Sequence, residues 1–287
     1  MAEMRSKKEK QPAVVIPLDG SETAVRAFGT SEAVTRMLGG VLHVMHVSDQ
    51  TVASEELPEL LKLKTIEVED FVIHQVSGHV VNTILEFALR IDACMIVMSS
   101  HGKTHDQELI AGGVTMEIVQ HTDIPVLVVR PDMKKPPGPD WRPRKMLVPL
   151  NGSPITATEV DQVFSLAGTI GVDIDVLHVA VVGEARPAEV GAYTSPVYAD
   201  YPHYDWSAWA DEFLRRFGGR RSESKVRLFH KRGEIVDATL AFAEQNDEDL
   251  VALIWRGRLE KERAATVKGI LQRAEAPVLL KRVKGGR

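Results

Sequence analysis

An eight-residue pattern occurs twice in this chain, first as Val14-Val15-Ile16-Pro17-Leu18-Asp19-Gly20-Ser21 and again, 132 residues later, as Met146-Leu147-Val148-Pro149-Leu150-Asn151-Gly152-Ser153. Each copy is a short apolar run that ends in Asp or Asn, Gly and Ser, residue types that favour turns and helix starts. Such a run is typical of a strand that is buried on both faces of a parallel sheet. The repetition predicts that the chain carries the same folding unit twice.

Further matches follow in the same order along the chain. They are Met45-His46-Val47 with Leu177-His178-Val179 at an offset of 132, Gly78 with Gly233 and Cys94 with Asp249 at 155, and Ile124-Pro125-Val126-Leu127 with Ala276-Pro277-Val278-Leu279 at 152. The second copy therefore gains 23 residues in its middle and loses three near its end. Ordered matches of this kind indicate an internal duplication.

A proline-rich segment separates the two copies. Residues 133–142 contain the run Pro136-Pro137-Gly138-Pro139. Because proline fixes φ and lacks a backbone N–H, we expect this linker to be extended and semi-rigid. The sequence thus predicts a first domain over residues 11–132 and a second over residues 143–284, which suits a length of 287 residues.

Composition excludes several classes of protein. Cys94 is the single cysteine, so neither an internal disulfide nor a cysteine-based zinc cluster can form. A formal net charge of −5 argues against nucleic-acid binding, which needs a basic footprint. No apolar run approaches the roughly 18 residues of a membrane helix, and Met1–Lys10 is polar. We therefore expect a cytoplasmic protein with no membrane and no nucleic-acid partner.

Apolar runs alternate with helical periodicity in the first copy. Five strands are predicted, at Ala13–Leu18, Val41–Val47, Phe71–Gln75, Cys94–Ser99 and Pro125–Arg130. Helices are predicted over residues 24–38, within 55–63, and over 80–89 and 112–120. The second copy repeats this order, so we expect an α/β protein of two tandem, doubly wound domains, each with a five-stranded parallel sheet.

Residues suited to a nucleotide follow the first and fourth predicted strands. Asp19 ends the first strand and can accept hydrogen bonds from a ribose or a base amine. Ser99-Ser100-His101-Gly102 ends the fourth, and Gly112-Gly113-Val114-Thr115 then opens a helix. Glycines let the backbone approach a ligand closely, and the N–H groups of a helix start attract phosphate. Ligands of doubly wound folds bind at such strand ends, so these positions predict a nucleotide pocket.

The order of these motifs resembles the universal stress protein family. The resemblance rests on Pro17-Leu18-Asp19-Gly20-Ser21, on Leu177-His178-Val179, on the glycine motif from residue 99 to 113, and on Pro125-Val126-Leu127-Val128-Val129. It covers both copies and implies the adenine-nucleotide α-hydrolase-like fold, some members of which bind ATP. ATP, with Mg²⁺ accompanying it, is therefore the ligand that the resemblance implies for the first domain.

The resemblance also implies roles for single residues. Asp19 and the backbone near Val47 correspond to nucleoside contacts, and the residues from Gly102 onward correspond to a phosphate cradle. The whole candidate site comprises Pro17, Asp19, Val47, Met98, Ser99, Gly102, Gly112, Gly113, Val114 and Thr115.

Departures from the family pattern make the two copies unequal. In the first, Ser99 replaces a glycine and Gly113 replaces the closing Ser or Thr, while Thr115 carries a hydroxyl two residues further on. In the second, Asn151 stands where the aspartate is expected, and Ile254-Trp255-Arg256-Gly257 puts two bulky side chains into the glycine motif. We expect any ATP site to lie in the first domain, with the second domain as a degenerate structural copy.

The 23 extra residues of the second copy fall within about residues 181–209. This stretch holds every tyrosine and two of the four tryptophans: Tyr193, Tyr198, Tyr201, Tyr204, Trp206 and Trp209. Aromatic side chains with polar tips are enriched at interfaces. The segment is interpreted either as a dimer arm or pocket lid, or as a loop packed on its own domain.

Histidine pairs are a further candidate for chemistry. His46 and His178 recur at the same place in both copies, which favours a shared structural hydrogen bond. His101 and His105 have the spacing of metal ligands on a helix but no predicted third ligand, so we expect no metal site.

Two functions remain open at this point. One is a stress-response protein that binds adenine nucleotide through its first domain. The alternative is a non-nucleotide scaffold for interaction or dimerisation, in which the aromatic segment and the exposed fifth strands make the contacts. No nucleophile–base pair emerges, so we expect no enzyme beyond slow incidental ATP hydrolysis. We also expect self-association, with the two copies packed pseudo-symmetrically and two chains pairing as a homodimer.

Overall fold

The computed structural model describes residues 11–64, 71–100, 113–134, 136–150, 157–180, 224–255 and 261–282. The first repeat (residues 11–132) contains β1 (Ala13–Pro17), α1 (Glu22–Val25), α2 (Phe28–Met37), β2 (Val41–Val47), α3 (Leu57–Leu60), β3 (Phe71–Val76), α4 (Val80–Arg90), β4 (Ala93–Ser99), α5 (Gly113–His121) and β5 (Val126–Val129). The second repeat (residues 143–284) contains β6 (Lys145–Leu150), α6 (Ala157–Ile170), β7 (Asp173–Ala180), β8 (Val226–Arg232), α8 (Ile235–Gln245), β9 (Leu250–Trp255), α9 (Lys261–Arg273) and β10 (Val278–Arg282).

The five strands predicted for the first repeat are all present, with ends within one residue of those expected. The long helix predicted over residues 24–38 is instead two helices, α1 and α2, with Arg26 and Ala27 between them. Apolar residues of both helices pack against the same face of the sheet, so the hydrophobic periodicity runs through the break and could not locate it.

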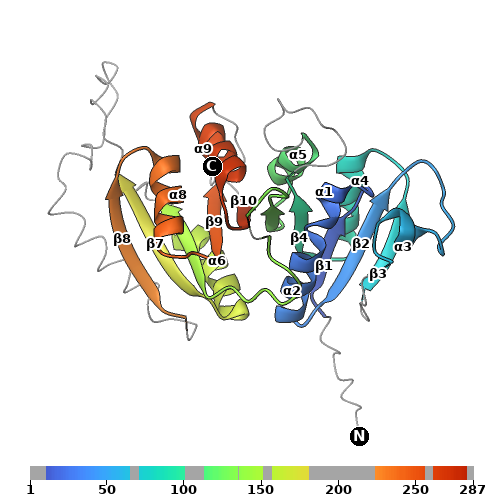
Figure 1. Ribbon diagram of the computed structural model, residues 1–287, viewed down its shortest axis with the longest axis horizontal. Helices are drawn as coiled ribbons and strands as arrows, with labels where there is room; N and C mark the ends of the chain where they lie inside the picture. The colour runs from blue at the N-terminus through green and yellow to red at the C-terminus, as the bar shows by residue number, and fades with distance from the viewer. Residues whose placement is uncertain are drawn as a thin grey trace, which may run out of the picture.

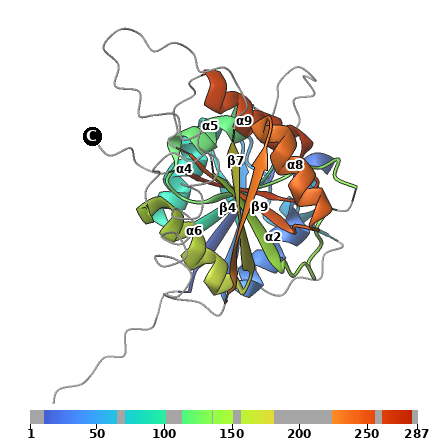
Figure 2. The same cartoon turned by 90° about the vertical axis from the view of Figure 1, so that its left-hand side faces the viewer.

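The two predicted five-stranded sheets join edge to edge into one ten-stranded sheet, β3-β2-β1-β4-β5-β10-β9-β6-β7-β8. Within each repeat the strands are parallel, as expected. Across the junction β5 and β10 are antiparallel, and Leu127 lies opposite Leu279, its own counterpart in the duplication. A pseudo-twofold axis therefore passes through this pair, and the sheet twists continuously from β3 to β8 (Figures 1 and 2).

The fifth strands are thus not exposed, contrary to what the scaffold hypothesis required. A short apolar strand with one unpaired edge presents unsatisfied N–H and C=O groups and an apolar surface. Pairing β5 with β10 satisfies these edge groups on both strands at once. We call this junction, β5 with β10, the seam.

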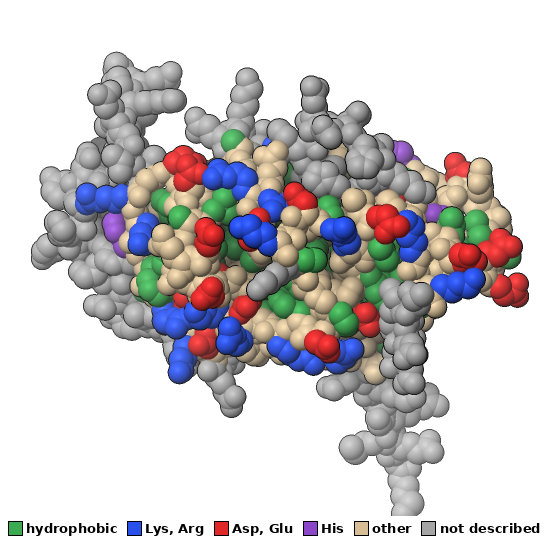
Figure 3. Space-filling view, in the orientation of Figure 1, with side chains coloured by type: hydrophobic (Ala, Val, Ile, Leu, Met, Phe, Trp, Pro, Cys, Tyr) green, Lys and Arg blue, Asp and Glu red, His purple; other side chains and the backbone are tan. Residues whose placement is uncertain are grey.

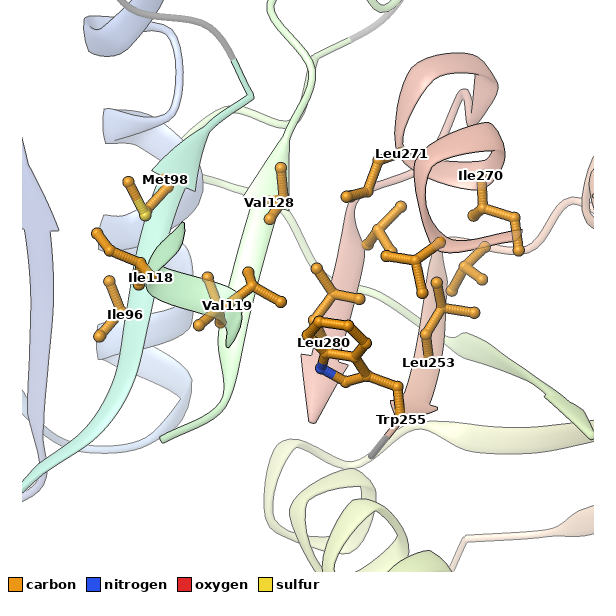
Figure 4. Packing of buried hydrophobic residues seen from close by; sticks show 14 of the residues in the cluster. Ile96, Met98, Ile118, Val119, Val128, Leu253, Trp255, Ile270, Leu271 and Leu280 are labelled. Carbon is orange, nitrogen blue, oxygen red and sulfur yellow. The ribbon is translucent and has the colours of Figure 1, made fainter. Parts of the chain in front are cut away.

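Helices cover both faces of the joint sheet. Helices α4, α5, α8 and α9 pack on one face, and α1, α2 and α6 on the other. Figure 1 shows α5 and α9 at the top of the molecule, and α2 and α6 at the bottom. Each face has a hydrophobic cluster that runs through both repeats. Figure 4 shows the first of these at the seam, where Val119 and Val128 of the first repeat lie beside Leu280 and Trp255 of the second. The two repeats therefore share one core on each face.

Two ion pairs repeat the pseudo-twofold symmetry at the seam. The Arg130 Nη2 donates to Glu275 Oε1 at 2.7 Å, and the Arg282 Nε donates to Asp123 Oδ1 at 2.9 Å. Each arginine also donates to a backbone carbonyl of the opposite repeat. Arg130 donates to the Gln272 carbonyl, and Arg282 donates to the Gln120 carbonyl. At the offset of 152 these are the same contacts made twice, so the repeats meet as two copies of one surface.

Candidate nucleotide site

The topological switch point of the first repeat lies between β1 and β4. Strands β2 and β3 extend the sheet on one side of this pair and β5 on the other, so the connections leave in opposite directions. In the register of β1 with β4, Val15 lies opposite Ile96, which brings the ends of the two strands to the same edge. The candidate residues Pro17 and Asp19 follow on one strand, and Met98 and Ser99 on the other.

The loop after β1 has a defined geometry that holds Asp19. The Asp19 Oδ1 accepts a hydrogen bond from the Ser21 N–H at 2.9 Å, and Ser21 Oγ accepts from the Ala24 N–H at 3.1 Å as the N-cap of α1. Gly20 between them has φ +80°, a value that L side chains rarely adopt. Asp19 is partly exposed, so its carboxylate is accessible from outside the loop while Oδ1 accepts from the Ser21 N–H.

His46 ties this loop to the neighbouring strand. Its buried ring has Nδ1 2.9 Å from the Leu18 carbonyl oxygen, and the Leu18 N–H donates to the Met45 carbonyl at 2.8 Å. The structural hydrogen bond predicted for both His46 and His178 is confirmed at His46. Its counterpart His178 stacks on His230 of the adjacent strand, with ring centroids 5.4 Å apart.

The start of α5 faces the same sheet edge. Gly113 and Val114 are exposed there, and a Cβ at Gly113 would meet no atom within 4 Å. Thr115 differs from the expectation that it contacts phosphate through its hydroxyl. Its side chain is 3% exposed, and its Oγ1 donates to the Ser99 carbonyl at 3.1 Å. The Thr115 hydroxyl therefore holds α5 against β4, and the backbone N–H groups of the first turn are what the helix offers an anion.

The other candidate residues divide into three groups. Pro17 and Val47 end adjacent strands and are partly exposed. Met98 is buried in the cluster under α4 and α5, so it can reach the strand ends only through its backbone. Gly102 and Gly112 lie outside the described residues.

The corresponding strand end of the second repeat is built differently. The strand registers place Trp255 at the position of Ser100, and Ile254 at that of Ser99. Ser100 is a small buried side chain, whereas Trp255 fills this position with an indole packed into the cluster that spans the seam (Figure 4). Asn151, Arg256 and the aromatic insertion at residues 181–209 lie outside the described residues.

Known proteins with similar sequences belong to one family. A model of the universal stress protein family matches residues 12–130 and 143–282. The chain belongs to the universal stress protein family. The Universal stress protein MJ0531 of Methanocaldococcus jannaschii is 29% identical over 142 residues, which cover 42% of this chain and 84% of that protein.

Solved structures share the tandem architecture. A functionally unknown protein from Pseudomonas aeruginosa has a TM-score of 0.66 at 12% identity, covering 95% of this chain and 92% of that one. A universal stress protein from Archaeoglobus fulgidus has a TM-score of 0.60 at 17% identity, covering 94% and 98%. At identities this low, the structural likeness establishes the fold of this tandem universal stress protein and nothing about its activity.

The surface of this family member carries mixed charge. On the face shown in Figure 3, basic and acidic side chains alternate across the middle of the molecule. Within the described ranges, no group of three or more His, Cys, Asp or Glu side chains is arranged to hold a metal ion. No described helix is long and apolar enough to cross a membrane.

A buried charged cluster in the second universal stress repeat is a feature that the motif search missed. Asp175 on β7 is 2% exposed and accepts from Arg227 Nε on β8 at 2.6 Å. Glu248, two residues before β9 begins, is 7% exposed. Burial first, and then the neighbouring Asp175 carboxyl, raise the pKa of Glu248 to about 8. The signal in the sequence was a pair of acidic residues inside or beside apolar strand runs.

Proposed function

We propose that the first repeat binds an adenine nucleotide at the ends of β1 and β4, and that the protein is a nucleotide-responsive stress protein whose second repeat is a structural copy. The observation that carries this proposal is the convergence at one sheet edge of the Asp19 loop and the start of α5. Asp19 supplies an acceptor suited to ribose hydroxyls. The first-turn N–H groups of α5 supply donors suited to phosphate oxygens.

The fit to a phosphate chain is supported by the space at Gly113. Since a Cβ there would meet nothing within 4 Å, the backbone is open to close approach by a ligand. The hydroxyls nearby are committed elsewhere, because Thr115 donates to Ser99 and Ser21 caps α1. Phosphate recognition would therefore rest on backbone N–H groups, which bind phosphate without supplying a nucleophile or base. This favours a sensor that holds nucleotide over an enzyme that turns it over.

The asymmetry between the repeats supports one nucleotide per chain. Trp255 stands in the seam cluster at the strand end where the first repeat has Ser100. The position of Asp19 is Asn151 in the second repeat, which lacks the negative charge and has one acceptor oxygen where the carboxylate has two. Both changes disfavour a second nucleotide site that holds its ligand as the first repeat is proposed to do.

Calorimetric titration of ATP and of ADP, each with magnesium, into the full chain tests the proposal. Asp19→Asn keeps an oxygen to accept from the Ser21 N–H while removing the charge, so the turn persists and the ligand contact weakens. We expect micromolar binding by the wild type and at least about tenfold weaker binding by the variant, a loss of roughly 1.4 kcal/mol. The matched control is Asn151→Ala, which alters the corresponding position of the second repeat and should leave affinity unchanged.

Two outcomes would contradict the proposal. One is the absence of binding together with no nucleotide released when freshly purified protein is denatured, which would leave the scaffold alternative. The other is equal weakening by Asp19→Asn and Asn151→Ala. Chromatography of nucleotide incubated with the protein separates binding from turnover, and stoichiometric hydrolysis on the time scale of binding would replace the sensor with an enzyme.

A further inference from the structure

A second concave site lies beside the seam, on the sheet face covered by α2 and α6. It is a half-open pocket of about 180 Å³ lined by Pro125, Gln162, Val163, Leu166, Leu279 and Lys281. These residues come from the start of β5, from α6 and from β10. The Asp19 and Gly113 site belongs to the other edge of the first repeat, so the pocket is independent of the proposed function.

The pseudo-twofold symmetry shows what occupies the equivalent place in the first repeat. At the offset of 132 the counterpart of Gln162 is Thr30 on α2, which is fully buried and whose Oγ1 donates to the Pro137 carbonyl at 2.9 Å. A Cβ built on the adjacent Gly29 would lie 3.0 Å from Pro139. The linker therefore covers this surface of α2 and accepts a hydrogen bond there.

The second repeat leaves the same surface open within the described residues. Gln162 is exposed on α6, although its counterpart Thr30 is buried. Met133, which follows β5 and packs into the cluster on this face, corresponds at the offset of 152 to Gly285, which has no side chain. An apolar pocket with a hydrogen-bonding group on its wall is the result.

Charge distinguishes the pocket from the equivalent surface of the first repeat, which the linker covers. Lys281 takes the place of Val129, and its half-buried ammonium donates to the Asp123 carbonyl. This contact uses one of its three N–H groups, and the Asp123 carboxylate is engaged by Arg282 at 2.9 Å. Burial is the larger effect on Lys281 and lowers its pKa, since a desolvated ammonium is disfavoured, while the Asp123 charge offsets this in part. A further anion beside the ammonium would offset the rest of that cost.

Volume sets the size of the ligand. An apolar cavity of about 150 Å³ accommodates benzene, so a pocket of this volume takes one ring or a short alkyl chain. Val163, Leu166, Leu279 and Pro125 supply the apolar wall. We propose that this pocket binds a small monocarboxylate, whose apolar part lies against this wall and whose carboxylate is held by the Lys281 ammonium and the Gln162 amide.

A charge series of isosteric probes tests the proposal on the full chain. Benzoate, benzyl alcohol and benzylamine are titrated separately and followed by NMR chemical-shift changes. We expect benzoate to bind with a dissociation constant of roughly 1 mM or tighter, a realistic value for so small a ligand, and benzylamine not to bind. Because ATP would occupy a different site, saturating ATP should not displace benzoate.

Two variants assign the binding to this pocket. Gln162→Glu changes an exposed helical position, so the variant should fold normally. It places a carboxylate on the pocket wall and should weaken the affinity for benzoate at least tenfold. Lys281→Met removes the cation at similar length and should abolish the preference for benzoate over benzyl alcohol. Lys268→Met on α9 is the matched control, since it removes a lysine from the opposite face of the sheet. Equal binding of benzoate and benzylamine, no benzoate binding, or equal weakening by the control would overturn the proposal.

Discussion

Glu248 is a carboxyl group in a place where the first repeat is apolar. Its counterpart at the offset of 155 is Ala93, and its neighbour Asp175 corresponds to His43. Neither Glu248 oxygen has a hydrogen-bond donor within reach among the described residues, although Arg227 and Lys145 act on it through their charge. A buried carboxyl in this situation holds its proton at neutral pH.

The pKa of about 8 makes the stability of the folded protein depend on pH. Between the ordinary pKa of 4.5 and 8, the folded state keeps a proton that the unfolded state has released, so the free energy of unfolding falls as pH rises through this window. Glu248→Gln, which is neutral at every pH, should remove that slope. We expect the variant to be more stable than the wild type at pH 8 by a few kcal/mol and to differ little at pH 4.5.

Urea unfolding of both proteins at several pH values measures this difference. Glu244→Gln is the matched control, because Glu244 is an exposed residue of α8 that precedes the same turn. A parallel pH dependence in the wild type and Glu248→Gln would show that Glu248 is ionised in the folded protein.

At the scale of elements, helix α5 connects stability to ligand binding. It begins at Gly113, itself a candidate phosphate residue, and the Thr115–Ser99 contact fixes it against β4. Its first-turn N–H groups have no partners within the helix, so a side-chain hydroxyl or an anion stabilises this end.

Gly113→Ser should therefore tighten nucleotide binding severalfold. The added Cβ meets nothing within 4 Å and the residue has no positive φ, so the hydroxyl is introduced without strain. The titration described for Asp19 measures the effect. Gly138→Ser in the linker is the matched control, since a Cβ there also lies in open space. Unchanged affinity in Gly113→Ser would remove the start of α5 from the phosphate site.

At the scale of the whole molecule, the seam makes two repeats into one folding unit. Two strands pair across it, a hydrophobic cluster on each face runs through it, and the two symmetric arginines cross it. The Arg130 contact also lowers the pKa of Glu275, after the larger effect of the Lys134 backbone N–H on that carboxylate. Unfolding one repeat would expose the core of the other.

We expect a single cooperative unfolding transition that Arg130→Met and Arg282→Met each shift to lower urea concentration. Because the two arginines make equivalent contacts with partly exposed partners, each loss should be similar, on the order of 1 kcal/mol. Circular dichroism and hydrogen exchange in both repeats measure it. Arg232→Met at the outer edge of β8 should have little effect, and separate transitions for the two repeats would contradict a shared core.

Sequence patterns located the strands but not their partner across the seam. Pro125-Val126-Leu127 and Pro277-Val278-Leu279 each predict a fifth strand, because apolar residues between turn signals are local information. That these strands pair with one another depends on contacts 152 residues apart, which no local pattern contains. The same reason explains why the pocket at Lys281 was missed, since its wall comes from three separate elements.

The candidate nucleotide residues show a similar limit. Motif spacing placed Asp19, Ser99 and Gly113 near one sheet edge, since parallel strands end together. It could not show that the Thr115 hydroxyl is committed to the Ser99 carbonyl, or that Trp255 enters the seam cluster. Both depend on side-chain direction and on packing across the seam.

The symmetric seam also has a consequence for how such a chain changes over generations. A contact made twice about a twofold axis is the signature of a homodimer, and a homodimer dissociates on dilution. Joined by a linker, its halves meet at an effective concentration that no longer depends on how much protein the cell contains. Mutations that spoil one pocket then leave assembly intact, so one half is released to acquire a buried tryptophan while the other retains its aspartate.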